Sequence, residues 1–361
     1  MKRSWVEVSR SRIAANYRAV RDAARPASVL GVVKANAYGH GAPEVARILC
    51  DEGVEWLAVS SVTEGVALRR AGIGARILVM AGVMQGEHAA LEEFRLTPVV
   101  HSLDELPLFR GPVHLKLDTG LNRLGTLAGV EEIAIALHGA PQVHLEGLLS
   151  HFASAANFIT RQTEDQIRIF EERIAALGSL GIHAHHLHLS STNAIAYPRP
   201  AITQTLVRPG HAIYGYVSTV RGHHSRFVVR PALQWKARII TVKDVPAGAK
   251  VGYGGTHITE APARLAVIAA GYADGISHRL SNKGKVIAGG RFAPIAGTVS
   301  MDLTSIDITA SPNLRPGDPV TILGREGDCS LDAQQIARTA GTISYNVLCA
   351  ISSRVERVYV D

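Results

Sequence analysis

Residues 29–41, VLGVVKANAYGHG, join an apolar run to a lysine and then to a turn with two glycines and a histidine. A parallel strand covered on both faces has this apolar character, so the segment predicts a buried strand, a turn at Lys34 and a helix after the turn. Three interpretations of Lys34 compete. The amine can reach water at the strand end, bind phosphate as a point charge, or act as a nucleophile that forms a Schiff base.

Similar apolar segments recur along the chain at roughly regular intervals, with helical patterns between them. They read WLAVSS, RILVMAG, TPVVHS, VHLKLDT, VHLEGLLSHF, HHLHLSS and LVRPGHAIYG. Eight strands alternating with helices over about 215 residues predict an α/β fold, a (βα)8 TIM barrel, with a doubly wound sheet as the alternative. In the helical segment 163–181, Thr163 and Gln166 have the spacing of a capping box, and Gly178 or Gly181 can end the helix.

The character of the sequence changes near residues 227–231, where strands and turns replace the alternation and a final helix, SLDAQQIARTAG, follows them. A chain of 361 residues exceeds what one hydrophobic core usually serves. We therefore expect a barrel over residues 9–228 and a mainly β C-terminal domain over residues 229–361. Residues 1–8 contain SWVEV, which alternates as a strand does and is expected to join the sheet of the C-terminal domain.

The composition excludes several classes of protein. Hydrophobic residues make up 47% and charged residues 19%, as in compact globular proteins. The net charge of +7 is spread along the chain, and aromatic residues make up only 5%, so we expect no nucleic-acid partner and favour a solvated surface or a small anionic ligand. Three separated cysteines without CxxC spacing, no apolar leader and no membrane-spanning stretch predict a cytoplasmic protein with no membrane partner.

Polar residues fall at or just beyond the ends of the expected strands, which is the face where barrel enzymes build their active sites. Each has an ordinary alternative, because a lysine can reach solvent, an aspartate can cap a turn and a histidine can pack in the core. Their convergence on one rim favours a functional site. The residues are Lys34, Lys116, Asp118, His151, Ser191, Thr192 and Arg208.

Two loops near the end of the barrel, SSTN after the seventh strand and RPGHA after the eighth, suit phosphate binding. Barrels frequently bind phosphate there with hydroxyls and backbone N–H groups. A phosphate site together with a Schiff-base lysine indicates pyridoxal phosphate, which needs both. A class I aldolase with a phosphorylated substrate would need both as well, so the residues alone indicate only a barrel that uses an imine lysine.

The segment VVKANAYGHG strongly resembles the cofactor-lysine motif of bacterial alanine racemases. Further matches follow in order across nearly the whole chain: KLDTGLNRLG at 116–125, SHFASA at 150–155, VRPGHAIYG at 207–215, GYADG at 271–275, VSMD at 299–302 and GTISYNVLCAISSRVERVY at 341–359. The resemblance implies a barrel that binds pyridoxal 5'-phosphate, a β-rich second domain, and an isomerase that interconverts L-alanine and D-alanine to supply D-alanine for peptidoglycan.

The resemblance also implies two catalytic residues. Lys34 would bind the cofactor as a Schiff base and then serve as the acid and base on one face of the substrate. Tyr272, in GYADG, would be the base on the opposite face, donated by the second subunit of a head-to-tail homodimer with shared active sites. Two bases on opposite faces are what racemisation requires, because one removes the α-proton and the other returns a proton.

Other positions take binding roles by the same resemblance. Arg208 would hydrogen-bond the pyridine nitrogen, Arg123 would lie near the phenolic oxygen and the substrate carboxylate, and His151 would pack against the ring. Lys116 matches a lysine that is carbamylated in many members, and the backbone N–H of Met301 matches a contact to the substrate carboxylate. The residues expected around the phosphate are Tyr38, Ser191, Thr192, Gly210, His211 and Tyr345.

The chain departs from the family pattern in places. It has SSTNA where many members have ANSA, so either Ser191 or Thr192 can supply the phosphate hydroxyl. His211 replaces an aliphatic residue that is usual in the family, Ser300 replaces a common cysteine, and Thr298 replaces a common arginine. These changes leave racemisation of serine, or of a broader set of amino acids, as an alternative.

Other functions fit the sequence less well. In HAHHLHL, His183 with His185 and His186 with His188 can share strand faces and bind metal. No nearby carboxylate or cysteine completes a set, so we expect packing and surface histidines and no metal. A non-catalytic pyridoxal-phosphate carrier would lack the second domain, and a decarboxylase of related fold would place an acid where Arg208 stands.

Overall fold

The computed structural model describes residues 2–199 and 202–361, and its contacts divide the chain into two compact units. The first unit comprises Arg12–Ala37 and Ala42–Arg230. The second comprises the described residues up to Ser11 together with Tyr38–Gly41 and Pro231–Asp361. The short segment Tyr38–Gly41, soon after Lys34, therefore belongs to the unit that the C-terminal part of the chain builds.

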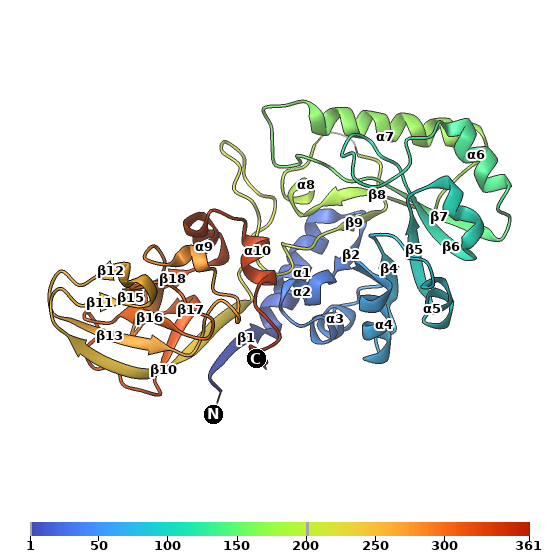
Figure 1. The fold of residues 1–361 in the computed structure, drawn as a ribbon. Coiled ribbons are helices and arrows are strands. Elements are labelled where there is room, and N and C mark those ends of the chain that lie inside the picture. The colour runs from blue at the N-terminus through green and yellow to red at the C-terminus, as the bar shows by residue number, and fades with distance from the viewer. Residues whose placement is uncertain (1, 200–201) are drawn as a thin grey trace. The chain divides into compact units, whose positions relative to one another are not determined.

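In the described part of the first unit, eight parallel strands close into a barrel in chain order (Figure 1). The first strand pairs with both the second and the last, which excludes a doubly wound sheet and confirms the predicted TIM barrel. The first four of these strands are mostly apolar because both of their faces are covered. The strands are β2 (Ser28–Val32), β3 (Trp56–Val59), β4 (Arg76–Val79), β5 (Leu96–Val100), β6 (Gly111–Lys116), β7 (Val143–Leu149), β8 (His186–Ser191) and β9 (Leu206–Arg208).

Helices connect the barrel strands and pack their apolar faces against them, as the 3.6-residue periodicity predicts. Within the described residues, none of the chain's helices has the length and apolarity that crossing a bilayer requires. The helical segments of this part are α1 (Arg10–Ala24), α2 (Lys34–Tyr38), α3 (Ala42–Asp51), α4 (Val62–Arg70), α5 (His88–Glu93), η1 (Leu103–Leu108), α6 (Val130–His138), α7 (Gln162–Ser179) and α8 (Thr192–Ala196).

The capping box expected at the start of α7 is wrong. Thr163 and Gln166 lie inside the helix, which begins at Gln162, and their side chains make tertiary contacts instead. The Thr163 hydroxyl donates to the Ser154 carbonyl at 3.2 Å, and the Gln166 amide donates to the His151 carbonyl at 2.9 Å. These two side chains therefore fix the loop after β7, which carries His151.

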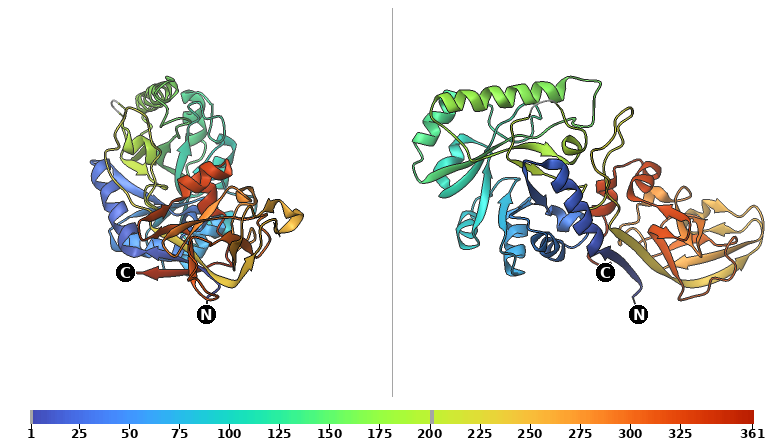
Figure 2. Two further views of the ribbon diagram at one scale, coloured as in Figure 1. Left: turned by 90° about the vertical axis from the view of Figure 1, so that its left-hand side faces the viewer. Right: turned by 180° about the vertical axis from the view of Figure 1, so that it is seen from behind.

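The second unit is built on a sheet that has nine strands among the described residues. Strand β1 pairs antiparallel with β10 and parallel with β19, and the long β10 also pairs with β13 and β17 (Figure 2). Met1, part of the expected segment 1–8, lies outside the described residues. The strands are β1 (Ser4–Ser9), β10 (Leu233–Val245), β13 (Ala263–Ile268), β14 (Lys285–Ala288), β15 (Arg291–Pro294), β16 (Thr304–Asp307), β17 (Pro319–Glu326), β18 (Cys329–Leu331) and β19 (Glu356–Val360).

Shorter elements complete this mainly β unit. Strands β11 (Lys250–Val251) and β12 (His257–Ile258) form a small hairpin around the turn η2 (Tyr253–Gly255), and η3 (His278–Leu280) precedes β14. The helix expected to end the chain, α9 (Ala333–Ala340), is followed by α10 (Ser344–Cys349) and then by β19.

A chain of ionisable side chains runs through the barrel interior. The Nδ1 atom of His114 lies 2.8 Å from Nε2 of His188, and both rings are fully buried. Glu146 lies 3.6 Å from the other nitrogen of His114 and forms a bidentate pair with Arg76 at 2.6 and 2.7 Å. Gly147 makes room for the cluster, since a Cβ there would lie 2.4 Å from Nδ1 of His114.

Three histidines of HAHHLHL pack with other rings, namely His185, His186 and His188. His186 stacks on His114 with ring centroids 5.8 Å apart, and its edge meets Trp56 at 5.5 Å. In the part of the chain that the structure describes, no group of three or more His, Cys, Asp or Glu side chains is arranged to hold a metal ion.

This cluster predicts that the barrel loses stability in mild acid. Burial lowers the pKa of His114, lowers that of His188 well below its ordinary value, and lowers that of His186 to about 4. Unfolded histidines bind protons below pH ~6.5, whereas these folded ones do not, so the free energy of unfolding falls as the pH falls from 6.5. For a fully buried ring the slope reaches about 1.4 kcal/mol per pH unit.

Urea unfolding followed by the fluorescence of Trp56, in a Trp5→Phe/Trp235→Phe background, measures this effect. We expect the midpoint to fall steadily from pH 6.5 to pH 5. A midpoint that stays constant over this interval would contradict the prediction.

Candidate active site

The chain leaves β2 through a left-handed turn that begins after Lys34. Ala35, Asn36, Ala37 and Tyr38 have φ angles of 52°, 52°, 54° and 52°. For residues other than glycine this conformation costs roughly 1–2 kcal/mol each. Such strain persists where the surroundings hold it, and it concentrates at functional sites.

Hydrogen bonds hold the turn in the first unit. The Asn36 side-chain oxygen accepts the N–H of Ala42 at 2.8 Å, which satisfies a donor at the start of α3, and the N–H of Ala37 donates to the Val33 carbonyl at 2.9 Å. The N–H of Ala35, directly after Lys34, donates to a Glu64 carboxylate oxygen at 2.7 Å.

In the second unit, contacts fix the residues that follow the turn. The Gly39 carbonyl accepts from Nε of Arg357 at 3.1 Å, and the His40 carbonyl accepts from the Tyr359 hydroxyl at 3.1 Å. Gly41 must lack a side chain, because a Cβ there would lie 1.8 Å from the Tyr359 hydroxyl.

Two of the expected phosphate ligands meet in the same unit. Tyr38 and Tyr345 lie with ring centroids 5.9 Å apart, and burial raises the pKa of each. Both phenols therefore stay neutral at physiological pH and can donate hydrogen bonds.

Positive charge gathers at the rim of the barrel. Lys116 ends β6 and is buried, with 6% of its surface exposed. Burial, and then the charges of Arg123, Arg208 and Lys34, lower the pKa of Lys116 to about 8, against the opposing charge of Asp118. About one tenth of this amine is therefore uncharged at pH 7, far more than for an ordinary lysine.

Arg208 ends β9, and its guanidinium is held by backbone carbonyls. Nη1 donates to His188 at 2.7 Å, and Nη2 donates to Ser150 at 2.5 Å and to Leu189 at 3.2 Å. Burial lowers the pKa of Arg208 to about 10, so it stays charged at neutral pH. Its Nε–H has no hydrogen-bond partner among the described residues and can donate to a ligand.

His151 follows β7 and lies against this arginine. Burial, and then the charge of Arg208, lower the pKa of His151 to about 3, so the ring is neutral. Nη2 of Arg208 lies 3.3 Å from its Nδ1. Because the guanidinium can only donate, Nδ1 accepts and the proton of His151 resides on Nε2.

The loop that carries Arg123 is ordered by Asp118. One Asp118 oxygen accepts three backbone N–H groups, from Gly120 at 2.9 Å and from Leu121 and Asn122 at 3.1 Å. Asp118 thus caps a turn, which was the ordinary alternative for this residue, and Arg123 extends from that turn with an exposed side chain.

The loops after β8 and β9 meet at the residues expected to bind phosphate. The Thr192 hydroxyl accepts the N–H of Ala212 at 3.2 Å, and the Gly210 carbonyl closes a turn with the N–H of Ile213 at 2.9 Å. Ser191, at the junction of β8 and α8, makes no capping bond with its side chain. His211 is buried and stacks on Tyr216, with ring centroids 5.0 Å apart.

In the second unit, the loops that carry Tyr272 and Met301 are joined. The N–H of Tyr272 donates to the Ser300 carbonyl at 2.9 Å, and the N–H of Ala273 donates to the Met301 carbonyl at 3.0 Å. Met301 is exposed, and its own N–H has no hydrogen-bond partner among the described residues.

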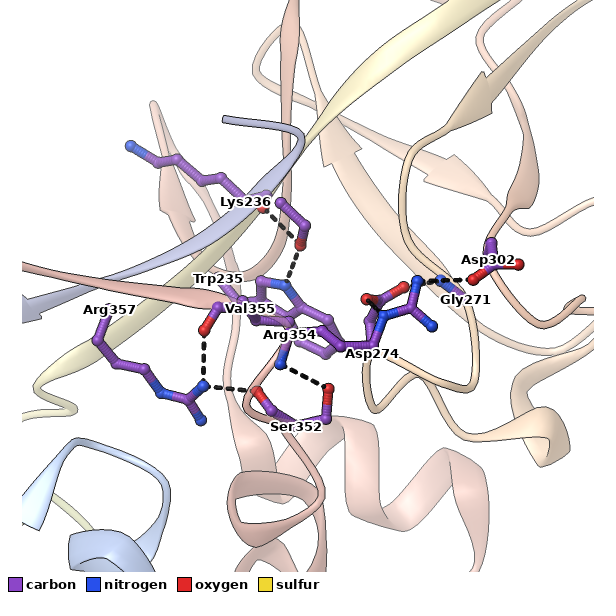
Figure 3. Close-up of polar contacts among 10 residues, drawn as sticks. Trp235, Lys236, Gly271, Asp274, Asp302, Ser352, Arg354, Val355 and Arg357 are labelled. Atoms are coloured by element: carbon purple, nitrogen blue, oxygen red, sulfur yellow. Dashed lines mark hydrogen bonds and ion pairs between the residues drawn. The ribbon is translucent and has the colours of Figure 1, made fainter. Parts of the chain in front are cut away.

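An arginine fastens these two loops to the C-terminal segment, as Figure 3 shows. Arg354 contacts Asp274 at 3.4 Å and Asp302 at 2.6 Å. Asp274 also accepts the Gly271 N–H at 2.9 Å through its side chain and the Ser352 N–H at 3.0 Å through its carbonyl. The Tyr272 and Met301 backbones therefore have fixed positions within this unit.

A second tyrosine lies beside the same loop. Tyr253 is 76% exposed, compared with 45% for Tyr272, and it lies on a turn in which Gly252 and Gly254 have positive φ angles. The Thr298 hydroxyl donates to the Tyr253 carbonyl at 3.1 Å.

These features define a class of barrel enzyme in which the rim of a TIM barrel carries the site and a β-rich unit follows. Residues 8–218 match the family model of the alanine racemase N-terminal domain, and residues 232–359 match that of the alanine racemase C-terminal domain. The chain belongs to the alanine racemase family and is an isomerase.

Relatives support this assignment over the full length. The alanine racemase of Syntrophobacter fumaroxidans is 38% identical, with 97% of this chain and 96% of that protein covered. The crystal structure of the Bacillus anthracis alanine racemase with bound L-Ala-P has a TM-score of 0.93 at 31% identity, covering 100% of this chain and 96% of that one. The Bartonella henselae alanine racemase, with covalently bound pyridoxal phosphate, has a TM-score of 0.88 at 25% identity, with both chains fully covered.

Proposed function

We propose that the protein interconverts L-alanine and D-alanine with pyridoxal 5'-phosphate as its cofactor and supplies D-alanine for peptidoglycan. The observation that carries this proposal is the Arg208 guanidinium, buried and fixed by three carbonyls with its Nε–H unpaired among the described residues. We further propose a cytoplasmic, head-to-tail homodimer with shared active sites. The three free cysteines suit such a reducing compartment.

The residues at the rim fit this cofactor. Lys34 supplies the amine that would bind it covalently, and His151 offers a neutral ring face. Ser191, Thr192, Gly210 and His211, with Tyr38 and Tyr345, supply hydroxyls and backbone groups for a phosphate. When bound, pyridoxal phosphate withdraws electrons from the substrate's Cα and so makes the α-proton acidic.

Arg208 would set the kind of reaction. A guanidinium donates a hydrogen bond but cannot accept a proton, so its ligand nitrogen stays unprotonated and withdraws electrons less strongly than it would beside an acid. Prompt return of the α-proton is then favoured over transamination or decarboxylation. Arg123, and the backbone N–H of Met301, are proposed to bind the substrate carboxylate.

Lys34 would move the proton on one face of the substrate, and a phenol of the second unit would move it on the other. The resemblance assigns Tyr272 to this role. Tyr272 is 45% exposed, so its phenol is accessible to a neighbouring subunit, and its ring lies 6.4 Å from that of His278 within its own unit. Tyr253, which is 76% exposed on a nearby turn, serves as the comparison tyrosine.

Lys116 is proposed to be carbamylated. Its lowered pKa supplies the free amine that reacts with carbon dioxide, forming an N–C bond and releasing one proton. The resulting anion would then be stabilised by the positive charges of Arg123 and Arg208. High-resolution mass spectrometry of crystals or native protein, with and without bicarbonate, tests this modification.

Incubation with single L-amino acids in deuterated water tests the substrate assignment. We expect L-alanine to yield deuterated D-alanine faster than L-serine or L-lysine yields its enantiomer, as chiral chromatography with mass detection measures. If L-serine reacts faster than L-alanine, the alternative specificity holds. If no amino acid is racemised by the cofactor-loaded protein, the proposal fails.

A further inference from the structure

We infer that Glu64 is a positioning residue for Lys34, because its carboxylate holds the left-handed turn that presents the amine. The inference rests on the proposed function of Lys34. Glu64 lies in the first turn of α4, outside the set of residues expected to touch cofactor or substrate.

The Glu64 carboxylate joins the loops that follow two neighbouring strands. One oxygen accepts the N–H of Ala35 at 2.7 Å, and the other accepts the N–H of Ser60 at 2.7 Å. Ala35 is bonded directly to Lys34, and Ser60 directly follows β3. Backbone donors to an ionised carboxylate make stronger hydrogen bonds than neutral pairs do.

The first turn of α4, which carries Glu64, is itself held in place. The Ser61 hydroxyl caps α4 by accepting the N–H of Glu64 at 3.3 Å. A glutamate at this helical position ordinarily bonds back to the N-cap N–H, whereas Glu64 reaches past it to Ser60 and Ala35. The next residue, Gly65, lies so close to Leu96 that a Cβ would come within 2.9 Å of it, so the helix has little room to shift.

The Glu64 carboxylate fixes the position of the turn, and the fold of the protein does not depend on it. Ala35 is exposed, so water can satisfy its N–H when the carboxylate is removed, and the protein should still fold. Water does not fix the peptide in the left-handed region, where residues other than glycine are unstable. Without Glu64 the turn can relax, and the direction in which Lys34 leaves the backbone changes with it.

Glu64→Ala is compared with Ser61→Ala, which also weakens the start of α4 but leaves the carboxylate in place. We expect Glu64→Ala to lower kcat about 10- to 100-fold, since misplacement of a catalytic group by about 1 Å has that effect. The KM for L-alanine should stay within about threefold of the wild-type value. Ser61→Ala should lower the thermal midpoint and keep the wild-type kcat.

Hydrogen–deuterium exchange of the cofactor-free protein gives a readout independent of activity. Peptides covering residues 35–41 should exchange faster in Glu64→Ala than in the wild type. Their exchange rate in Ser61→Ala should equal that of the wild type. Glu64→Gln, whose single amide oxygen can replace only one of the two acceptors, should lie between them, and it serves as the test if Glu64→Ala does not fold.

The inference would be overturned if Glu64→Ala kept the wild-type kcat and the wild-type deuterium exchange of residues 35–41. It would also be overturned if Ser61→Ala lowered kcat and speeded this exchange as much as Glu64→Ala does. Failure of the proposed function is recognised separately. In that case borohydride would not attach the cofactor to Lys34 of the wild-type protein, while the exchange comparison would still report whether Glu64 holds the turn.

Discussion

Lys34→Arg is expected to be inactive, with kcat/KM for L-alanine lowered by at least about 10⁴-fold. The substitution keeps a positive charge at the strand end but removes the primary amine. A lysine that only reaches solvent, or that only neutralises phosphate, would tolerate it. A lysine that binds the cofactor covalently and moves a proton would not.

Absorbance and mass spectrometry complete this experiment. The wild-type protein should be yellow, and borohydride should attach the cofactor to the peptide that contains Lys34. Lys34→Arg should lack that adduct and retain the wild-type circular dichroism. Activity within about tenfold of the wild type would contradict the covalent role of Lys34.

Tyr272→Phe is expected to lower racemisation about 10²- to 10⁴-fold in both directions, the range that removal of a general base produces. Exchange of the α-proton in deuterated water should nevertheless persist for one enantiomer, because Lys34 still serves one face of the substrate. Proton NMR of each enantiomer, before any inversion, measures this exchange.

Tyr253→Phe is the matched comparison. Both variants remove one phenolic oxygen from a tyrosine beside the Met301 loop, so general effects on that unit are similar. We expect the smaller loss in Tyr253→Phe. If Tyr253→Phe instead shows the larger loss and the exchange limited to one enantiomer, the base is Tyr253 and the role proposed for Tyr272 is wrong.

The barrel could be predicted from the sequence because each strand is a short apolar run and each run ends at polar residues. The rim positions of Lys116, His151 and Arg208 followed from the strand ends alone. The left-handed turn could not be predicted in this way. The residues in that conformation, Ala35–Tyr38, include no glycine, so their backbone geometry depends on partners elsewhere in the chain.

Other features also depended on tertiary contacts. Thr163 and Gln166 have the spacing of a capping box, but their bonds to the loop after β7 prevail over that local pattern. His114 and His188 are 74 residues apart, and only closure of the barrel brings their rings together. Glu64 was not predicted because its bonds to Ala35 and Ser60 join segments that only the folded barrel brings together.

Complementation between two inactive chains tests the central claim most directly, that Lys34 and a tyrosine of the other subunit form one site. Lys34→Ala and Tyr272→Phe chains are refolded together, and mixed dimers are verified by native mass spectrometry. About half of the dimers that form by random pairing are mixed, and each mixed dimer would hold one intact site of two, so the activity of the mixture should recover to about one quarter of the wild-type value. Verified mixed dimers that remain as inactive as their parents, with Tyr253→Phe as well as with Tyr272→Phe, would contradict the account.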